Sequence, residues 1–208
     1  MKILIADDHS VVRQGVSLVL REYFIDMQVT QADTFEMTLT LLKHDVFSLI
    51  LLDINLPGGN SVTMIDAVKA IQKKAKILVF SAYDEEQYAL RYIQAGADGY
   101  LNKLSSEDKI IEAVKTVLKG DKYMGESIKN LLAQHPGAML HDNPFYLLSN
   151  REMEIMLLLV NGEGNIEIAN KLNIGMSTVS TYKSRIFDKV GVTNVVSLAE
   201  KYRLHAAN

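Results

Sequence analysis

The first 120 residues alternate strand-like and helix-like segments, and this alternation restricts the possible fold more than any other feature of the sequence. Apolar, strand-like runs cover 2–6, 27–32, 48–53, 76–81 and 99–101. Segments with helical spacing of apolar residues follow them, near 10–23, 34–43, 61–72, 84–95 and 105–119. The segment SLILL at 48–52 is apolar after its serine, as expected for a strand covered by helices on both faces. Five such repeats predict an α/β fold with a five-stranded parallel sheet between layers of helices.

The segment from residue 145 onward has only helical patterns. Ser149 and Glu152 have the S-x-x-E spacing of a capping box, and an apolar run follows at 155–160. Further helices are predicted over 165–172, over 177–190 and from about 193 to 203. Helices of this length joined by short turns predict a small all-α domain of four helices, as in a helix-turn-helix.

Between these two patterns lies a segment, 121–144, that matches neither. It holds two of the three prolines of the chain, and its stretch 135–144 is polar and rich in turn-forming residues. We predict a linker here. The expected organisation is a first domain over 1–120, a linker over 121–144 and a helical domain over 145–208, which suits a chain of 208 residues.

Composition restricts the setting in which such a chain works. There is no cysteine, which excludes disulfides and thiolate metal sites and fits a reducing cytoplasm. The start, MKILIADDHS, does not resemble a signal peptide, and no apolar run reaches the roughly 18 residues of a membrane span, so we expect a cytoplasmic protein. Residues 145–208 carry seven Lys and Arg against six Asp and Glu. DNA binding by this part therefore requires its positive charge to be gathered on one face.

Polar and charged side chains stand at the predicted carboxyl ends of four strands. Asp7 and Asp8 follow the first strand, Asp53 and Ser81 end the third and fourth, and Lys103 follows the fifth. In parallel α/β sheets the functional crevice lies outside these ends, so the residues are expected to converge. Carboxylates of Asp8 and Asp53 and a backbone carbonyl suit Mg²⁺. Asp53 would attack a phosphoryl group, whose charge Mg²⁺ and the Lys103 ammonium would offset.

Each of these residues also has an ordinary explanation when taken alone. The two N-terminal aspartates could cap the following helix, Asp53 could belong to a turn, and Lys103 could be a surface lysine. Their joint occurrence at the ends of the right strands favours the functional interpretation. His9 invites a metal-ligand interpretation, but no second histidine or cysteine accompanies it, so we predict a helix-start or surface residue.

Four segments carry a resemblance to a known family. DDHSVVRQG, LILLDINLPGGN, FSAYDE and GADGYLNK resemble the receiver motifs of NarL/FixJ-type response regulators, which implies a flavodoxin-like (βα)5 domain. The resemblance makes Asp53 the phosphorylated aspartate and Lys103 the lysine of the family pattern. It implies a Mg²⁺ site formed by Asp8, Asp53 and the backbone carbonyl of Asn55, with Asp7 assisting. It also makes Ser81 the switch hydroxyl and Tyr100 the switch aromatic.

The C-terminal segment, from LSNREMEIMLLLV to FDKVGV, resembles a LuxR-type helix-turn-helix domain. In this match 165–172 is the first helix of the motif and 176–190 is the recognition helix. The expected DNA contacts are Ser180, Thr181 and Ser184 toward base edges and Lys183, Arg185 and Lys189 toward phosphates. Many relatives have lysine where this chain has Ser180, and a serine discriminates bases less than a lysine does. We therefore expect DNA affinity to depend on binding as a dimer.

These features predict a DNA-binding response regulator of a two-component system. A sensor histidine kinase would phosphorylate Asp53, the added charge would act through Ser81 and Tyr100, and the protein would regulate transcription as a homodimer on double-stranded DNA. We expect no enzymatic activity beyond Mg²⁺-dependent self-phosphorylation and autodephosphorylation. Two alternatives remain open: a hydrolase or phosphotransferase with an aspartate nucleophile, and a module that works by protein contact alone.

Overall fold

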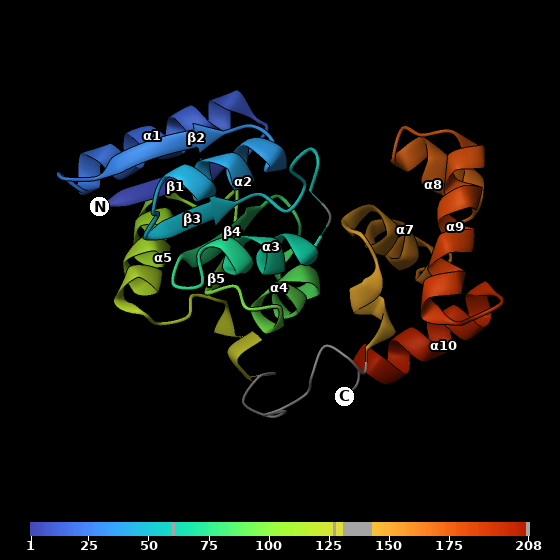
Figure 1. Ribbon diagram of the computed structural model, residues 1–208. Coiled ribbons are helices and arrows are strands. Elements are labelled where there is room, and N and C mark those ends of the chain that lie inside the picture. Colours follow the sequence, from blue (N-terminus) through green and yellow to red (C-terminus); the bar gives the residue numbers. More distant parts are fainter. Residues whose placement is uncertain (60, 127, 131–142, 207–208) are drawn as a thin grey trace. The chain divides into compact units, whose positions relative to one another are not determined.

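The computed structural model describes residues 1–206 except 60, 127 and 131–142, and it divides the chain into two compact units, Met1–Ala138 and Met139–Asn208. Each unit is described by itself (Figure 1). In the part of the chain that the structure describes, every helix is too short or too polar to cross a membrane.

Unit 1 is a sheet of five parallel strands in the order β2-β1-β3-β4-β5. The strands are β1 (Lys2–Ala6), β2 (Gln28–Ala32), β3 (Leu49–Leu52), β4 (Lys76–Ser81) and β5 (Gly99–Asn102). The helices are α1 (Ser10–Tyr23), α2 (Phe35–His44), α3 (Thr63–Ile71), α4 (Glu85–Gln94) and α5 (Glu107–Lys119). The predicted α/β fold is confirmed, and no helix or strand bound in unit 1 differs from the sequence prediction by more than two residues.

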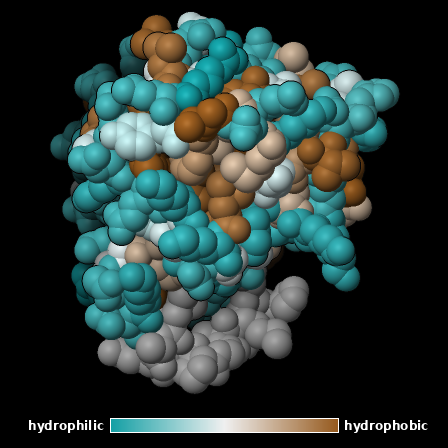
Figure 2. All heavy atoms as spheres, turned by 90° about the vertical axis from the view of Figure 1, so that its left-hand side faces the viewer, coloured by the Kyte–Doolittle hydropathy of each residue, from teal (hydrophilic) through white to brown (hydrophobic). Residues whose placement is uncertain are grey.

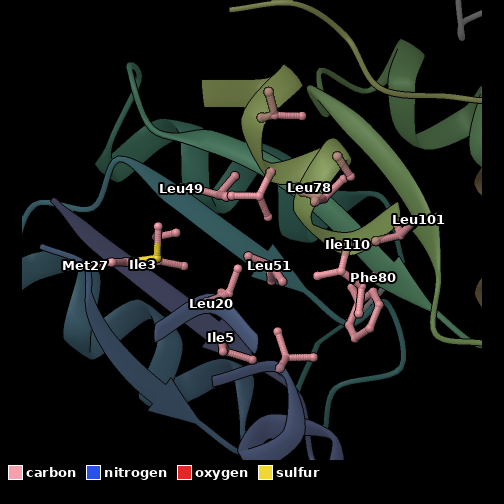
Figure 3. Close-up of a cluster of buried hydrophobic side chains, with 14 residues drawn as sticks. Ile3, Ile5, Leu20, Met27, Leu49, Leu51, Leu78, Phe80, Leu101 and Ile110 are labelled. Atoms are coloured by element: carbon pink, nitrogen blue, oxygen red, sulfur yellow. The ribbon is translucent and has the colours of Figure 1, made fainter. Parts of the chain in front are cut away.

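Alternate residues of the inner strands build one side of the core. Ile3 and Ile5 of β1, with their counterparts on β3, β4 and β5, point to a single cluster that α1 and α5 cover (Figure 3). Side chains one residue along, such as Leu4 and Ile50, are fully buried on the opposite face of the sheet, where α2, α3 and α4 lie (Figure 1). Successive side chains of a strand point to opposite faces, so a strand covered on both sides is apolar throughout. This explains the continuous burial of β3.

The first part of the predicted linker packs on unit 1. Tyr123 forms a parallel bridge with Gly99, and its carbonyl accepts a 2.9 Å hydrogen bond from the amide of Tyr100. Met124 and Ile128 are buried. The sequence predicts a linker from 121 onward, and its first residues pack here because the unpaired edge of β5 offers backbone partners that a helix-strand pattern does not reveal. The rest of that linker, from 131 to 142, lies outside the described residues.

Unit 2 is helical, as predicted. It contains the short 3-10 helix η2 (Pro144–Leu147), α7 (Asn150–Val160), α8 (Asn165–Lys171), α9 (Met176–Val190) and α10 (Val195–Ala206). The predicted capping box is present: Ser149 Oγ accepts from the amide of Glu152, and the Glu152 carboxylate accepts from the amide of Ser149 at 2.7 Å. Its small core buries one face each of α7, α8 and α9, including Ile155, Ile168 and Ile186.

The two edges of the sheet of unit 1 differ in chemistry. Exposed apolar side chains, among them Met1, Ile25 and Val46, precede β1, β2 and β3 at the amino-terminal edge. Figure 2 views the molecule from the side on which the amino terminus lies in Figure 1, and brown hydrophobic residues stand there among hydrophilic ones. The converging acids and the lysine lie at the opposite, carboxyl-terminal edge, where a parallel α/β sheet holds its functional crevice.

Candidate functional site

An acidic cluster lies where β1 and β3 end. Oxygens of Asp7, Asp8 and Asp53 and a ring nitrogen of His9 all lie within 4.8 Å of one another. Asp7 and Asp53 are buried, with 1% and 3% exposure, whereas Asp8 and His9 are exposed. The position follows from the sheet, because paired β1 and β3 end side by side: the amide of Asp53 donates to the carbonyl of Ala6 at 2.8 Å. The structure thus brings together the three aspartates that the sequence placed at the ends of two strands, Asp7 and Asp8 after β1 and Asp53 after β3.

Lys103 joins this cluster from β5. Its Nζ lies 2.6 Å from Oδ2 of Asp7 and 2.8 Å from Oδ2 of Asp53, and its side chain is 9% exposed. The backbone amide of Lys103 donates to the carbonyl of Ser81 at 2.8 Å, which continues the β4–β5 pairing and directs the side chain to the edge. One ammonium therefore faces two buried carboxylates.

The electrostatics of the site follow from this imbalance. Burial raises the pKa of the Asp53 carboxyl, and the nearby Asp7 adds to the rise, while Lys103 and the amide of Asn55 lower it without cancelling the effect of burial. For Lys103, burial acts to lower the pKa, but the carboxylates of Asp53 and Asp7 outweigh it and raise it. Asp53 is thus a destabilised carboxylate beside a firmly protonated lysine, as an oxygen nucleophile toward a phosphoryl group requires.

The donor atoms at this edge suit a hard divalent cation. Carboxylate oxygens of Asp8 and Asp53 are the ligand type that Mg²⁺ prefers, and the exposure of Asp8 leaves room for waters. Asn55 directly follows the cluster, and its amide donates to Oδ1 of Asp53 at 3.1 Å. His9 is exposed and is the N-cap residue of α1, as predicted, and its Nδ1 lies 2.7 Å from Oδ1 of Asp8. The acidic cluster can therefore hold a metal ion.

The two expected switch residues, Ser81 and Tyr100, lie in the neighbouring strands β4 and β5. Ser81 is fully buried, and its Oγ accepts from the amide of Tyr83 at 3.1 Å. Tyr100 is fully buried as well, and its hydroxyl donates to the carbonyl of Tyr83 at 3.1 Å. Burial raises the pKa of the Tyr100 phenol, so the hydroxyl stays a hydrogen-bond donor at neutral pH. Tyr100 therefore already occupies an inward position in this structure.

Other residues around α4 escaped the sequence reasoning. The rings of Tyr83 and Tyr88 stack with centroids 4.6 Å apart, and the rings of Tyr92 and Tyr100 lie 6.4 Å apart. Arg91, in the same helix, is buried. The i, i+4 spacing of Tyr88 and Tyr92 is a signal that could have predicted a buried aromatic face, but nothing in the sequence distinguishes Arg91 from a surface arginine.

Unit 2 presents part of α9 to solvent. Ser180, Thr181, Ser184 and Arg185 are exposed, and Lys183 is half-buried with its ammonium 5.7 Å from the ring centroid of Phe187. Two of the expected base-contacting hydroxyls, those of Ser180 and Thr181, already have internal partners. Ser180 Oγ donates to the carbonyl of Met176 and accepts from Asn165, and Thr181 Oγ1 donates to the carbonyl of Ser177. Their capacity to contact bases is thereby reduced.

Lys189, the last of the expected phosphate contacts, has a partner inside unit 2. Its Nζ lies 2.6 Å from Oε2 of Glu152, which is buried, and 3.3 Å from the carbonyl of Leu147. Burial acts to raise the pKa of Glu152, but Lys189 and the amide of Ser149 hold it below its usual range. The contact ties α9 to α7 and η2, while the Lys189 side chain is itself 39% exposed, so its phosphate contact stays a prediction.

Two family models match the chain. Residues 3–115 match the response regulator receiver domain, and residues 146–201 match the bacterial regulatory proteins of the luxR family. The first match covers the acidic cluster, Ser81, Tyr100 and Lys103, and the second covers α7, α8 and α9.

Individual relatives span the whole length of the chain. The oxygen regulatory protein NreC of Staphylococcus carnosus is 37% identical over 96% of this chain and 95% of its own length. The fimbriae Z protein of Escherichia coli K12 is 32% identical over 98% and 96%. Among solved structures, the Salmonella typhimurium response regulator RcsB matches with a TM-score of 0.60 and 25% identity, over 98% of both chains. A structure of RcsB in complex with DNA matches with a TM-score of 0.59, also at 25% identity and 98% of both chains.

Proposed function

The chain belongs to the response regulators that join a receiver domain to a LuxR-type DNA-binding domain, and from this premise we propose that phosphorylation of Asp53 controls how unit 2 binds DNA. The observation that carries the proposal is the buried Asp53 carboxylate, whose Oδ2 lies 2.8 Å from Lys103 Nζ beside the acids of β1. Membership of this family also argues against a hydrolase or phosphotransferase with an aspartate nucleophile, because the family consists of regulators.

Asp53 is the nucleophile of the proposed phosphorylation. An oxygen of Asp53 attacks the phosphorus of the donor, either a phosphohistidine of a sensor kinase or a small acyl phosphate, and the bond from phosphorus to the donor breaks as the new P–O bond forms. Lys103, held between Asp53 and Asp7, offsets charge on the transferred group. Asp8, Asp53, the carbonyl of Asn55 and, in support, Asp7 would hold Mg²⁺, which neutralises phosphoryl oxygens when bound. In hydrolysis of the phosphorylated Asp53, water would attack the phosphorus and the same residues would offset the charge on the transferred group.

The signal leaves the site through Ser81 and Tyr100. A phosphoryl group on Asp53 brings new acceptor oxygens within reach of the loop after β4, and Ser81 is the hydroxyl that ends that strand. The buried hydroxyl of Tyr100 already bonds the carbonyl of Tyr83 in the same loop. Phosphorylation would therefore stabilise the inward position of Tyr100 and shift a population toward it, in place of moving the ring from outside.

Unit 2 is the proposed DNA-binding part. The exposed face of α9 would enter the major groove of double-stranded DNA, with Ser184 as the main candidate for a base contact. Lys183 and Arg185 would contact phosphates. Ser180 and Thr181 would contribute less to base contact because their hydroxyls are bonded internally. Lys189, which also pairs with Glu152, stays a candidate for a phosphate contact. We propose that the protein acts as a homodimer after phosphorylation, in the cytoplasm where its kinase and DNA are accessible.

The domain division belongs to the same proposal. We keep the receiver at 1–120 and the DNA-binding domain at 145–208, with the connection in 121–144. Within this connection Tyr123 pairs with Gly99 and Ile128 is fully buried, so the first part of the connection packs on the receiver.

Incubation with acetyl phosphate and Mg²⁺ tests the phosphoacceptor. Intact-mass spectrometry should record one added phosphoryl group on the wild type and on Asp33→Asn, an exposed aspartate that serves as control, and none on Asp53→Asn. Equal uptake by Asp53→Asn would refute the assignment. Gel-shift assays with genomic DNA fragments, with and without acetyl phosphate, then test the coupling, which requires tighter DNA binding after phosphorylation by the wild type and Asp33→Asn but not by Asp53→Asn.

A further inference from the structure

Unit 1 buries a whole arginine side chain in its fourth helix. Arg91 of α4 is 1% exposed and is the largest of the fully buried side chains in the described residues. A guanidinium stays protonated in proteins, and a buried charge is costly unless hydrogen bonds and nearby dipoles compensate it. The surroundings of Arg91 are therefore expected to be built around its donors.

One of those donors reaches the loop that follows the phosphoacceptor strand. Nη2 of Arg91 lies 2.5 Å from Oγ of Ser61, and both side chains are buried. Ser61 has a φ of 52°, and Asn173 is the other non-glycine residue with positive φ among the residues that the structure describes. Asparagine adopts this left-handed backbone readily, whereas serine persists there only when its surroundings enforce it. The hydrogen bond and the strained backbone thus coincide at one residue.

One end of this hydrogen bond lies in the loop that follows Asp53, and the other lies in the helix that packs on the switch tyrosine. Ser61 closes the loop that begins at Asp53 and contains Asn55, whose amide bonds Oδ1 of Asp53. Arg91 lies with its guanidinium carbon 5.5 Å from the ring centroid of Tyr92, and that ring is 6.4 Å from the ring of Tyr100. Arg91 therefore links the phosphoacceptor loop to the helix that packs on the switch tyrosine.

We infer that Arg91, acting through Ser61, is a positioning residue of the phosphoacceptor loop. It fixes Ser61 against α4, so that the positions of Asn55 and Asp53 in the same loop depend on where α4 lies. By thermodynamic reciprocity, a phosphoryl group or metal ion that orders the loop also favours that position of α4. The inference rests on the proposed function for its consequence, but the link itself can be tested without phosphorylation.

Hydrogen–deuterium exchange of the metal-free full chain tests the link directly. Ser61→Ala removes the hydroxyl and keeps the backbone strain, and Arg91→Met keeps an apolar stem of similar length. Each should speed exchange about fivefold or more, the size of a coupling between bonded residues, both in 54–63 and in 85–94. The exposed residues Ser48 and Arg21 supply matched controls, Ser48→Ala and Arg21→Met, which should leave both segments unchanged. Exchange at wild-type rates in 54–63 for both test variants would overturn the inference.

A second measurement separates positioning from plain stability. The Mg²⁺ concentration that half-saturates phosphoryl uptake from acetyl phosphate should rise about fivefold or more in Ser61→Ala, and in Arg91→Met the serine change should add no further shift. Should Arg91→Met fail to fold, the serine variants still decide. A lower melting temperature with an unchanged Mg²⁺ half-saturation in Ser61→Ala means a merely structural bond and refutes the inference. A wild type that takes up no phosphoryl group refutes the proposed function instead, and leaves the exchange experiment valid.

Ser61→Gly distinguishes the hydrogen bond from the backbone. Glycine accepts positive φ without strain but lacks the hydroxyl. If the bond to Arg91 positions the loop, Ser61→Gly should match Ser61→Ala in Mg²⁺ half-saturation. If Ser61→Gly matches the wild type while Ser61→Ala does not, the left-handed backbone positions the loop by itself, and the role given to Arg91 is wrong.

Discussion

Replacing Lys103 by methionine removes the only ammonium described in the acidic cluster and should make the stability of unit 1 depend on pH. The Lys103 Nζ lies 2.6 Å from Asp7 and 2.8 Å from Asp53, and these carboxylates are 1% and 3% exposed. Methionine keeps most of the volume, so the change tests charge and not packing. Two buried carboxylates, whose oxygens lie within 4.8 Å of each other, are then left without the Lys103 ammonium.

The size of the effect follows from two costs. Removing one partner of a buried ion pair costs about 3–5 kcal/mol. Protonating one carboxylate removes the repulsion between the two and costs about 5 kcal/mol at about pH 7.5 for an ordinary Asp pKa of about 3.9. At about pH 5.5 this protonation cost falls to about 2 kcal/mol. The free energy of unfolding lost by Lys103→Met should therefore be smaller at the lower pH by about 1–3 kcal/mol.

The sign follows from the causes of the Asp53 shift. Burial and Asp7 raise the pKa of Asp53, and Lys103 opposes them. Without Lys103 the pKa rises further, so the folded state takes up a proton more readily than the unfolded state does. A carboxyl with a raised folded-state pKa loses stability as pH rises through that pKa and regains it as pH falls.

Exchange of the slowest amides in β1 and β3, followed at both pH values, reports the stability of unit 1 alone. Lys109→Met, at an exposed lysine of α5, controls for the change in net charge. Adding Asp53→Asn to Lys103→Met should restore most of the lost stability at the higher pH, because it removes one of the two negative charges that repel each other. An equal loss at both pH values, or no rescue by Asp53→Asn, would refute the electrostatic reasoning.

Three further predictions address other parts of the chain. Glu152→Gln should lower the stability of unit 2 by about 1–3 kcal/mol at neutral pH. Lys189 and Ser149 hold the pKa of Glu152 low against the effect of burial. The extra stability of the wild type should therefore disappear as pH falls through that pKa. Thermal melts by circular dichroism across pH check this, and a parallel decline in the variant would contradict it. A methyl group on Gly99 would lie 2.9 Å from the Tyr123 carbonyl oxygen and 2.9 Å from Leu78 Cδ1, so Gly99→Ala should destabilise unit 1 by about 1–3 kcal/mol. Gly15→Ala, in α1 with open space around it, should instead stabilise by about 0.5–1 kcal/mol in the same denaturation assay; equal effects would disprove the packing argument. Lys183→Ala should weaken DNA binding across sequences and reduce the salt slope of log K by about 0.9, measured by fluorescence anisotropy, with Lys171→Ala as control. An unchanged slope would remove Lys183 from the phosphate face.

Short-range patterns carried much of the prediction. The alternation of strand and helix specified the sheet and both helical layers, because burial on two faces forces a strand such as β3 to be apolar throughout. The capping box at Ser149 marked the start of α7 to the residue. The ends of parallel strands necessarily share one edge, and so Asp53 and Lys103, 50 residues apart, could be expected to meet.

The remaining features depended on contacts that no local pattern encodes. The burial of Arg91 and its bond to Ser61 join segments 30 residues apart, and the pairing of Lys189 with Glu152 spans 37 residues. In sequence these are ordinary charged residues of amphipathic helices, and only the packing of one helix against another decides whether a charge faces water or a partner. The pattern of apolar and polar residues thus predicted the fold and the charged residues that meet at the carboxyl ends of the strands. Tertiary structure decided which polar groups are already satisfied, because a donor loses its freedom only when a distant acceptor is packed within reach.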